Sequence, residues 1–146
     1  MRWFLIICVL VTGLHWSPDA HADDITALRT RAEQGDAEAQ VSLGFMYGNG
    51  QGVVPDDKQA VVWYRKAADQ GQAVAQNNLG IMYGNGQGVV QNYVQAHKWY
   101  NLAAANSTGE DYELAARNRS IVEKKMTPQQ VAEAQRLAGE WQVRQP

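Results

Sequence analysis

A segment of 36 residues occurs twice in succession, and this repeat restricts the chain to a small class of folds. Residues 32–67 and 68–103 align without a gap, and 22 of the 36 aligned positions are identical. Self-similarity with a period between 20 and 50 residues is typical of solenoids, in which each unit buries its apolar face only against its neighbours. The sequence therefore predicts an array of stacked units in place of one globular core.

Each unit carries the signals of two helices joined by a glycine-rich turn. The first helix is predicted over residues 36–47 and is expected to end at Gly48, because glycine adopts the left-handed conformation that closes a helix at little cost. The second helix is predicted to start after Asp56, with Gln59 three residues later, which approximates a capping box. The same two places in the second unit hold Asn92 and Gln95. Each unit is thus predicted to be an antiparallel helical hairpin.

The repeat continues in incomplete form at both ends. Residues 23–31 are predicted to belong to the second helix of a partial unit, because 25–34 aligns with 61–70. Residues 104–142 are predicted to be a degenerate C-terminal unit or cap, with a helix over 110–125 and a last helix that begins after Thr127. Atypical end units suit a solenoid, since their outer faces meet water. The predicted fold class is all-α, an α/α superhelical solenoid of helix–turn–helix repeats.

The first 22 residues have the features of a secretory signal peptide. The apolar run from Trp3 to Leu14 has about 12 residues, whereas a membrane-spanning helix needs about 20. Ala20 and Ala22 then flank His21 in the pattern that signal peptidase recognises. Cleavage after Ala22 is predicted, so that residues 23–146 form an exported repeat domain with no stable membrane anchor. The expected location is periplasmic or secreted, in a bacterium.

Positions that differ between the two units form helical stripes. In the first helix they include 38, 41, 42 and 45, which share one face of an α-helix, while the identical positions lie on the other face. We interpret the identical faces as packed core, including the recurring aromatic residues Trp63 and Trp99, and the differing stripes as surface. The predicted protein-binding surface consists of Glu38, Val41, Ser42, Phe45, Val74, Asn77, Asn78 and Ile81.

Phe45 and Ile81 are the two apolar residues of this surface that could anchor a partner. As exposed apolar side chains they would be suitable anchors in an interface. The alternative is that both pack against a neighbouring helix of the same chain. The sequence leaves these two interpretations open.

The repeated unit resembles a known family. Its pattern, A-x-Q-G-x-A-x-A-Q-x-x-L-G-x-M-Y-G-N-G-x-G-V followed by A-x-x-W-Y-x-x-A, is similar to that of the Sel-one-like repeats, relatives of the tetratricopeptide hairpins. The resemblance implies a right-handed superhelix with a concave surface and an adaptor or regulator that binds another protein. It leaves a host-directed role and an envelope-signalling role equally open. A cysteine-rich branch of the family is associated with β-lactam binding or hydrolysis, which makes a β-lactamase-like enzyme the alternative function.

The residue inventory disfavours most catalytic chemistry. Removal of residues 1–22 would take away Cys8, the one cysteine, and leave His97 as the one histidine. A zinc site needs three or four converging ligands, mainly Cys and His, so neither a metal nor a cofactor is expected. His97 lies on a varying stripe and is predicted to be an exposed helix residue. The protein is accordingly predicted not to be an enzyme.

Three other kinds of site are also disfavoured or weakly indicated. A net charge of -2 argues against nucleic-acid binding, which needs a basic patch. The glycine-rich loop follows a predicted helix and lacks the lysine of a phosphate loop, so it is interpreted as a turn. Asn106 and Asn118 begin N-glycosylation acceptor patterns, which short sequences produce by chance.

Overall fold

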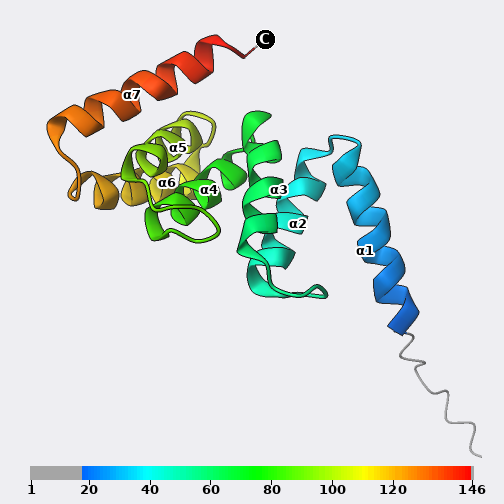
Figure 1. Ribbon diagram of the computed structural model, residues 1–146. Helices are drawn as coiled ribbons and strands as arrows, with labels where there is room; N and C mark the ends of the chain where they lie inside the picture. Colours follow the sequence, from blue (N-terminus) through cyan, green and yellow to red (C-terminus); the bar gives the residue numbers. More distant parts are fainter. Residues whose placement is uncertain (1–17, 146) are drawn as a thin grey trace, which may run out of the picture.

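The first six helices of the chain form a row that runs from right to left in Figure 1 and pack in sequence order, and the seventh turns back over the row. The computed structural model describes residues 18–145, and within them it has seven helices and no strand. The helices are α1 (Pro18–Glu33), α2 (Ala37–Asn49), α3 (Asp57–Asp69), α4 (Ala73–Asn85), α5 (Tyr93–Ala105), α6 (Gly109–Glu123) and α7 (Pro128–Val143). The prediction of an all-α repeat solenoid is confirmed.

The N-terminal helix extends beyond the start predicted for the mature chain. Residues 1–17 of the predicted signal peptide lie outside the described part of the chain, whereas α1 begins at Pro18. The predicted cleavage point after Ala22 therefore falls inside α1. Cleavage there would leave a helix that begins at Asp23.

The helical hairpins of the two units depend on a glycine that faces a tyrosine. α2 packs extensively on α3, and α4 packs extensively on α5. A Cβ atom on Gly44 would lie 2.6 Å from the ring of Tyr64, and one on Gly80 would lie 2.6 Å from the ring of Tyr100. Only glycine allows the two helices to approach so closely, because any side chain would overlap the ring.

The first helices, α2 and α4, end two residues later than the sequence predicted. Gly48 lies inside α2, and the left-handed residue that closes the helix is Gly50, with φ of 67°. The amides of Gly50 and Gln51 both donate to the carbonyl of Met46. The prediction that Gly48 closes the helix was wrong, since three glycines alternate in this loop and the pattern does not indicate which of them closes the helix; both Gly50 and Gly52 have a positive φ.

The second helices begin where they were predicted, but with half of the capping box. The side chain of Asp56 accepts hydrogen bonds from the amides of Lys58 and Gln59. The amide of Asp56, however, donates to the carbonyl of Tyr47 across 2.9 Å, so it is not available to the Gln59 side chain. This bond closes the glycine-rich loop on the preceding helix. Thr127 at the start of α7, by contrast, has the complete capping box with Gln130.

The last helix, α7, does not pair with α6 as the repeat would suggest. It turns back across α5 (Figure 1), where Trp141 meets Trp99 edge to face with 6.3 Å between ring centroids. Leu102 of α5 and Ala138 of α7 are buried in the same core cluster. The equivalent of Leu102 in α3 is Lys66, which is exposed. This change from a charged to an apolar side chain is the sequence signal that α5, but not α3, is covered on its outer face.

Candidate protein-binding surface

The surface predicted from the varying stripes is only partly exposed. Phe45 is 48% exposed and Val74 is 39% exposed, and Glu38 and Ser42 are exposed as well. Val41, Asn78 and Ile81 are half-buried. Asn77 is buried, with 8% of its surface accessible. The eight residues therefore do not form one continuous exposed face.

Asn77 is the member of this set that the structure places in the interior. Its side-chain oxygen accepts a hydrogen bond from Nδ2 of Asn118 across 3.0 Å, and Asn118 belongs to α6. The prediction that Asn77 is exposed was wrong. The comparison of two units could not reveal it, because the helix that covers Asn77 comes from the degenerate third unit.

The structure assigns Phe45 and Ile81 to different environments. Ile81 packs against a core cluster formed by Ala96, Tyr100 and Val122, so it contacts neighbouring helices of its own chain. Phe45 has no such cover and remains an exposed apolar side chain. The interface interpretation thus stays available for Phe45, while the packing interpretation describes Ile81.

A groove lies between α4 and α6 beside Ile81. It has a volume of about 230 Å³. Its lining includes Ile81, Asn85, Tyr100, Asn118, Ile121 and Lys125. Ile121 is 52% exposed, and it stands 36 residues after Asn85 and 72 after Asn49. Continuing the repeat into 109–123 would have placed Ile121 on this face from sequence alone.

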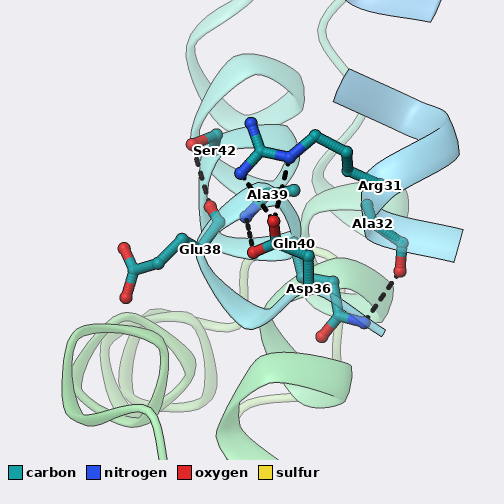
Figure 2. Close-up of polar contacts among 7 residues, drawn as sticks. All are labelled: Arg31, Ala32, Asp36, Glu38, Ala39, Gln40 and Ser42. Carbon is teal, nitrogen blue, oxygen red and sulfur yellow. Dashed lines mark hydrogen bonds and ion pairs between the residues drawn. The ribbon is translucent and has the colours of Figure 1, made fainter. Parts of the chain in front are cut away.

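Buried amide side chains hold the first helices at a fixed spacing. Gln40 donates to the carbonyl of Ala32 across 2.9 Å (Figure 2) and accepts from Gln70 across 2.8 Å. The next unit repeats this arrangement. There Gln76 donates to the Ala68 carbonyl and accepts from Asn106. Gln40 therefore links α1 to Gln70, the C-cap of α3, and Gln76 links α3 to Asn106, the C-cap of α5.

The carboxylate at the start of α2 has a structural role. Asp36 accepts hydrogen bonds from the amide of Ala39 and from the Arg31 guanidinium (Figure 2). The hydrogen bond from the Ala39 amide has the largest effect on the pKa of Asp36, followed by that from Arg31. Together they hold this pKa below its ordinary value. A carboxylate so engaged caps the helix and favours its N-terminus.

His97 is buried, contrary to the prediction that it is exposed. It is 1% exposed, and its Nε2 lies 3.3 Å from Oε2 of Glu123 in α6. Desolvation lowers the pKa of His97, although the hydrogen bond with Glu123 opposes the shift. The equivalent residue Val61 is also buried, with 7% of its surface accessible. In both units the first helix of the next unit covers this position.

The described residues offer neither a metal site nor a membrane-spanning helix. Within that part of the chain, no group of three His, Cys, Asp or Glu side chains is placed to hold a metal ion. None of the helices described combines the length and the apolar character needed to cross a membrane. Both asparagines of the predicted glycosylation patterns use their side-chain nitrogen within the protein: Asn106 donates to Gln76 and Asn118 donates to Asn77.

Comparison with known proteins agrees with the hairpin architecture. Residues 37–72 and 73–107 match the family model described as Sel1 repeat. A protective antigen of uropathogenic Escherichia coli strains, which has an SLR fold, is 38% identical with a TM-score of 0.78. That similarity covers 86% of this chain but 26% of the antigen, so the chain spans about a quarter of its length.

A second solved structure supports the same assignment. A Sel1 repeat protein from Oxalobacter formigenes is 29% identical, with a TM-score of 0.58 over 80% of this chain and 53% of that one. A search of curated proteins found no match. Members of this family commonly mediate protein–protein interactions. From its two matched repeats and these structural neighbours, the chain belongs to the Sel1-repeat proteins.

Proposed function

We propose that the protein is a non-catalytic, exported interaction module that binds another protein through the face formed by α2, α4 and α6. The observation that carries the proposal is that apolar side chains on this face are exposed, whereas the apolar side chains that recur in both units, such as Leu43 and Leu79, are buried. Phe45 is 48% exposed, Leu114 is 44% exposed and Ile121 is 52% exposed. Apolar side chains that remain about half exposed are suited to anchor an interface.

Three observations support the adaptor role and the export. The repeat family commonly mediates protein–protein interaction, and its helical fold is typically a non-catalytic scaffold. The sequence of residues 1–22 has the three regions of a signal peptide. One similar structure is named as a protective antigen of a pathogen. Mass spectrometry of exported protein should find an N-terminus at Asp23, and an exported protein that retains Met1 would exclude cleavage.

A crosslinking experiment tests the docking face directly. A photoreactive amino acid is placed at position 45 in one variant and at position 121 in a second, and the chain is expressed in its native cells. The matched control carries the same group at Val90, a loop residue that is 89% exposed and lies outside this face. We expect one protein to be captured from positions 45 and 121 but not from position 90. Equal capture from all three positions would exclude a specific docking face.

Substitution then tests whether the captured protein depends on this face. Phe45→Asp and Ile121→Asp should abolish capture of that protein while helicity by circular dichroism is unchanged, because both side chains are exposed. Ile81→Asp is expected to lower stability instead, since Ile81 packs against the core. We do not extend the proposal to β-lactam hydrolysis, which no observation favours. The chromogenic cephalosporin nitrocefin should remain intact in the presence of the protein.

A further inference from the structure

His97 stands out among the described residues as a titratable group enclosed by the helices. Its ring is 1% exposed, and its one polar contact is the 3.3 Å approach of Nε2 to Oε2 of Glu123. The other ring nitrogen, Nδ1, is buried and has no hydrogen-bond partner. A neutral imidazole tolerates this arrangement, since the unpartnered nitrogen can be the one without a proton.

The preceding unit contains an internal reference for this position. Val61 occupies the same place in α3 and is buried against α4, as His97 in α5 is buried against α6. An aliphatic side chain therefore satisfies the packing at this site. The histidine adds nothing that the repeat architecture needs, and it adds a group that changes charge near neutral pH.

The helix that covers His97 is held less firmly than its counterparts. α2 lies between α1 and α3, and α4 lies between α3 and α5, so each packs on two second helices. α6 packs extensively on α5 alone, because α7 turns back onto α5. α6 also supplies Asn118, Ile121 and Val122 to the groove beside Ile81. The seating of α6 on α5 therefore determines the shape of that groove.

Protonation of His97 would act on this seating. The charged groups that face the ring are Glu123, which attracts an imidazolium, and Arg119, which repels it, and both belong to α6. A protonated ring has two N–H donors, yet the structure provides an acceptor for one of them. A buried charge with an unsatisfied donor is unfavourable. The protein can relieve it by letting α6 move and water reach Nδ1.

We propose that proton uptake by His97 releases α6 from α5 and so opens the groove between α4 and α6, which makes the docking face sensitive to acid. The release itself follows from the α5–α6 contact. Its consequence for a partner rests on the proposed function. An exported protein is exposed to the pH of its surroundings, so acidification there would increase the open population.

The direction of the effect follows from the state that binds the proton. Burial lowers the pKa of His97 in the closed state below the ordinary 6.5, whereas in the open state the ring titrates near 6.5. The closed state therefore has its full stability above pH 6.5 and loses it as the pH falls. The open population should rise by up to about tenfold per pH unit below 6.5, until the pKa of the closed state is reached.

Hydrogen exchange of the whole chain between pH 7.5 and 5.0 tests this proposal, with rates corrected for the intrinsic effect of pH. We expect amides of α6 to lose protection below pH 6.5 in the native protein, while amides of α2 keep theirs. His97→Val, which installs the residue of the preceding unit, should make α6 protection independent of pH over this range. His97→Gln serves the same purpose if the valine variant does not fold.

A second variant examines the partner of the histidine. Glu123→Gln removes the attraction that favours protonation in the closed state, so loss of protection should continue to lower pH than in the native protein. The proposal is overturned if the native protein and His97→Val show the same pH dependence of α6 exchange. It is also overturned if the His97 ring titrates at or above 6.5 by NMR. Neither measurement uses a partner, so failure of the docking proposal would leave this result unaffected.

Discussion

Arg119 of α6 donates a hydrogen bond to Oδ1 of Asn101 of α5 across 2.6 Å. The two residues are 18 positions apart, and the same spacing joins a second helix to the next first helix elsewhere in the array. Arg29 donates to the Tyr47 hydroxyl across 2.6 Å, and Arg65 donates to the Tyr83 hydroxyl. In the third instance the arginine has moved to the other helix. The link between units persists although the donor and the acceptor have exchanged sides.

This exchange predicts a rescue experiment. Arg119→Tyr should lower the free energy of unfolding by about 1–2 kcal/mol, because it removes a charge-assisted hydrogen bond from a half-buried site. Asn101→Arg alone should also be destabilising, since it places two guanidinium groups together. The double variant recreates the pair of the earlier units and should recover most of the loss. Urea denaturation gives the three values, and additive losses would show that the two positions are not coupled.

The close approach of Gly80 and Tyr100 predicts that a favourable helix residue will destabilise the protein. Gly80→Ala should cost about 1–3 kcal/mol by overpacking, despite the helix propensity of alanine. The control is Gly139→Ala in α7, where a Cβ atom meets nothing within 4 Å. That change should stabilise the protein by about 0.5–1 kcal/mol. A stabilised Gly80→Ala variant in thermal denaturation would contradict the packing described.

The buried amide link between units predicts a penalty for an apolar replacement. Gln76→Leu keeps the volume of the side chain but leaves the Ala68 carbonyl and the Asn106 amide without their partner. The expected loss is about 2–4 kcal/mol, since a buried polar group without a partner retains its full desolvation cost. Gln129→Leu, at an exposed position of α7, should change stability by less than about 0.5 kcal/mol. Equal effects of the two changes in chemical denaturation would argue against the link.

The docking of α7 on α5 predicts a local loss of order. Trp141→Ala should cost about 2 kcal/mol and should increase hydrogen exchange in α7 while α2 remains protected, because α7 packs mainly on α5, where Trp141 meets Trp99. Trp99→Ala should cost more, about 3–5 kcal/mol, because Trp99 is 1% exposed and belongs to the main core cluster. Unchanged exchange in α7 after loss of Trp141 would show that another contact holds this helix.

Two buried tyrosines predict a loss of stability in alkali. Burial raises the pKa of Tyr64 and of Tyr100 to about 12, against an ordinary value of 10.0. Because the folded-state pKa is the higher one, this contribution to stability is complete below pH 10 and declines as the pH rises from 10 to 12. Absorbance at the phenolate band should show two of the six tyrosines ionising late. Phenolate formation complete by pH 11 in the folded protein would contradict their burial.

Much of the fold could be predicted because each repeated element has a local cause. The N-caps at Asp56 and Asn92 and the buried faces around Leu43 and Leu79 follow from residue spacing, which a sequence displays directly. The position of the left-handed glycine did not follow, because Gly48, Gly50 and Gly52 are equivalent by composition and differ only in how the loop meets Pro55 and Ile25.

The surface predictions failed where a third unit intervened. Asn77 and His97 were assigned to exposed stripes on the comparison of two units, and both are covered by α6. A position that varies between units is not held to one residue by the contacts that recur within each unit. It does not distinguish solvent from a neighbour with different residues.

By itself the sequence determined the repeat, the helical hairpins and the buried faces within them, since these features depend on residues that recur at a fixed spacing. Only the tertiary structure decided which side of α5 receives α7, which of Phe45 and Ile81 is exposed, and that His97 is enclosed. Those outcomes depend on how the degenerate end of the chain packs against the regular part. That packing depends on contacts between segments far apart in sequence, and a local pattern of residues does not predict such contacts.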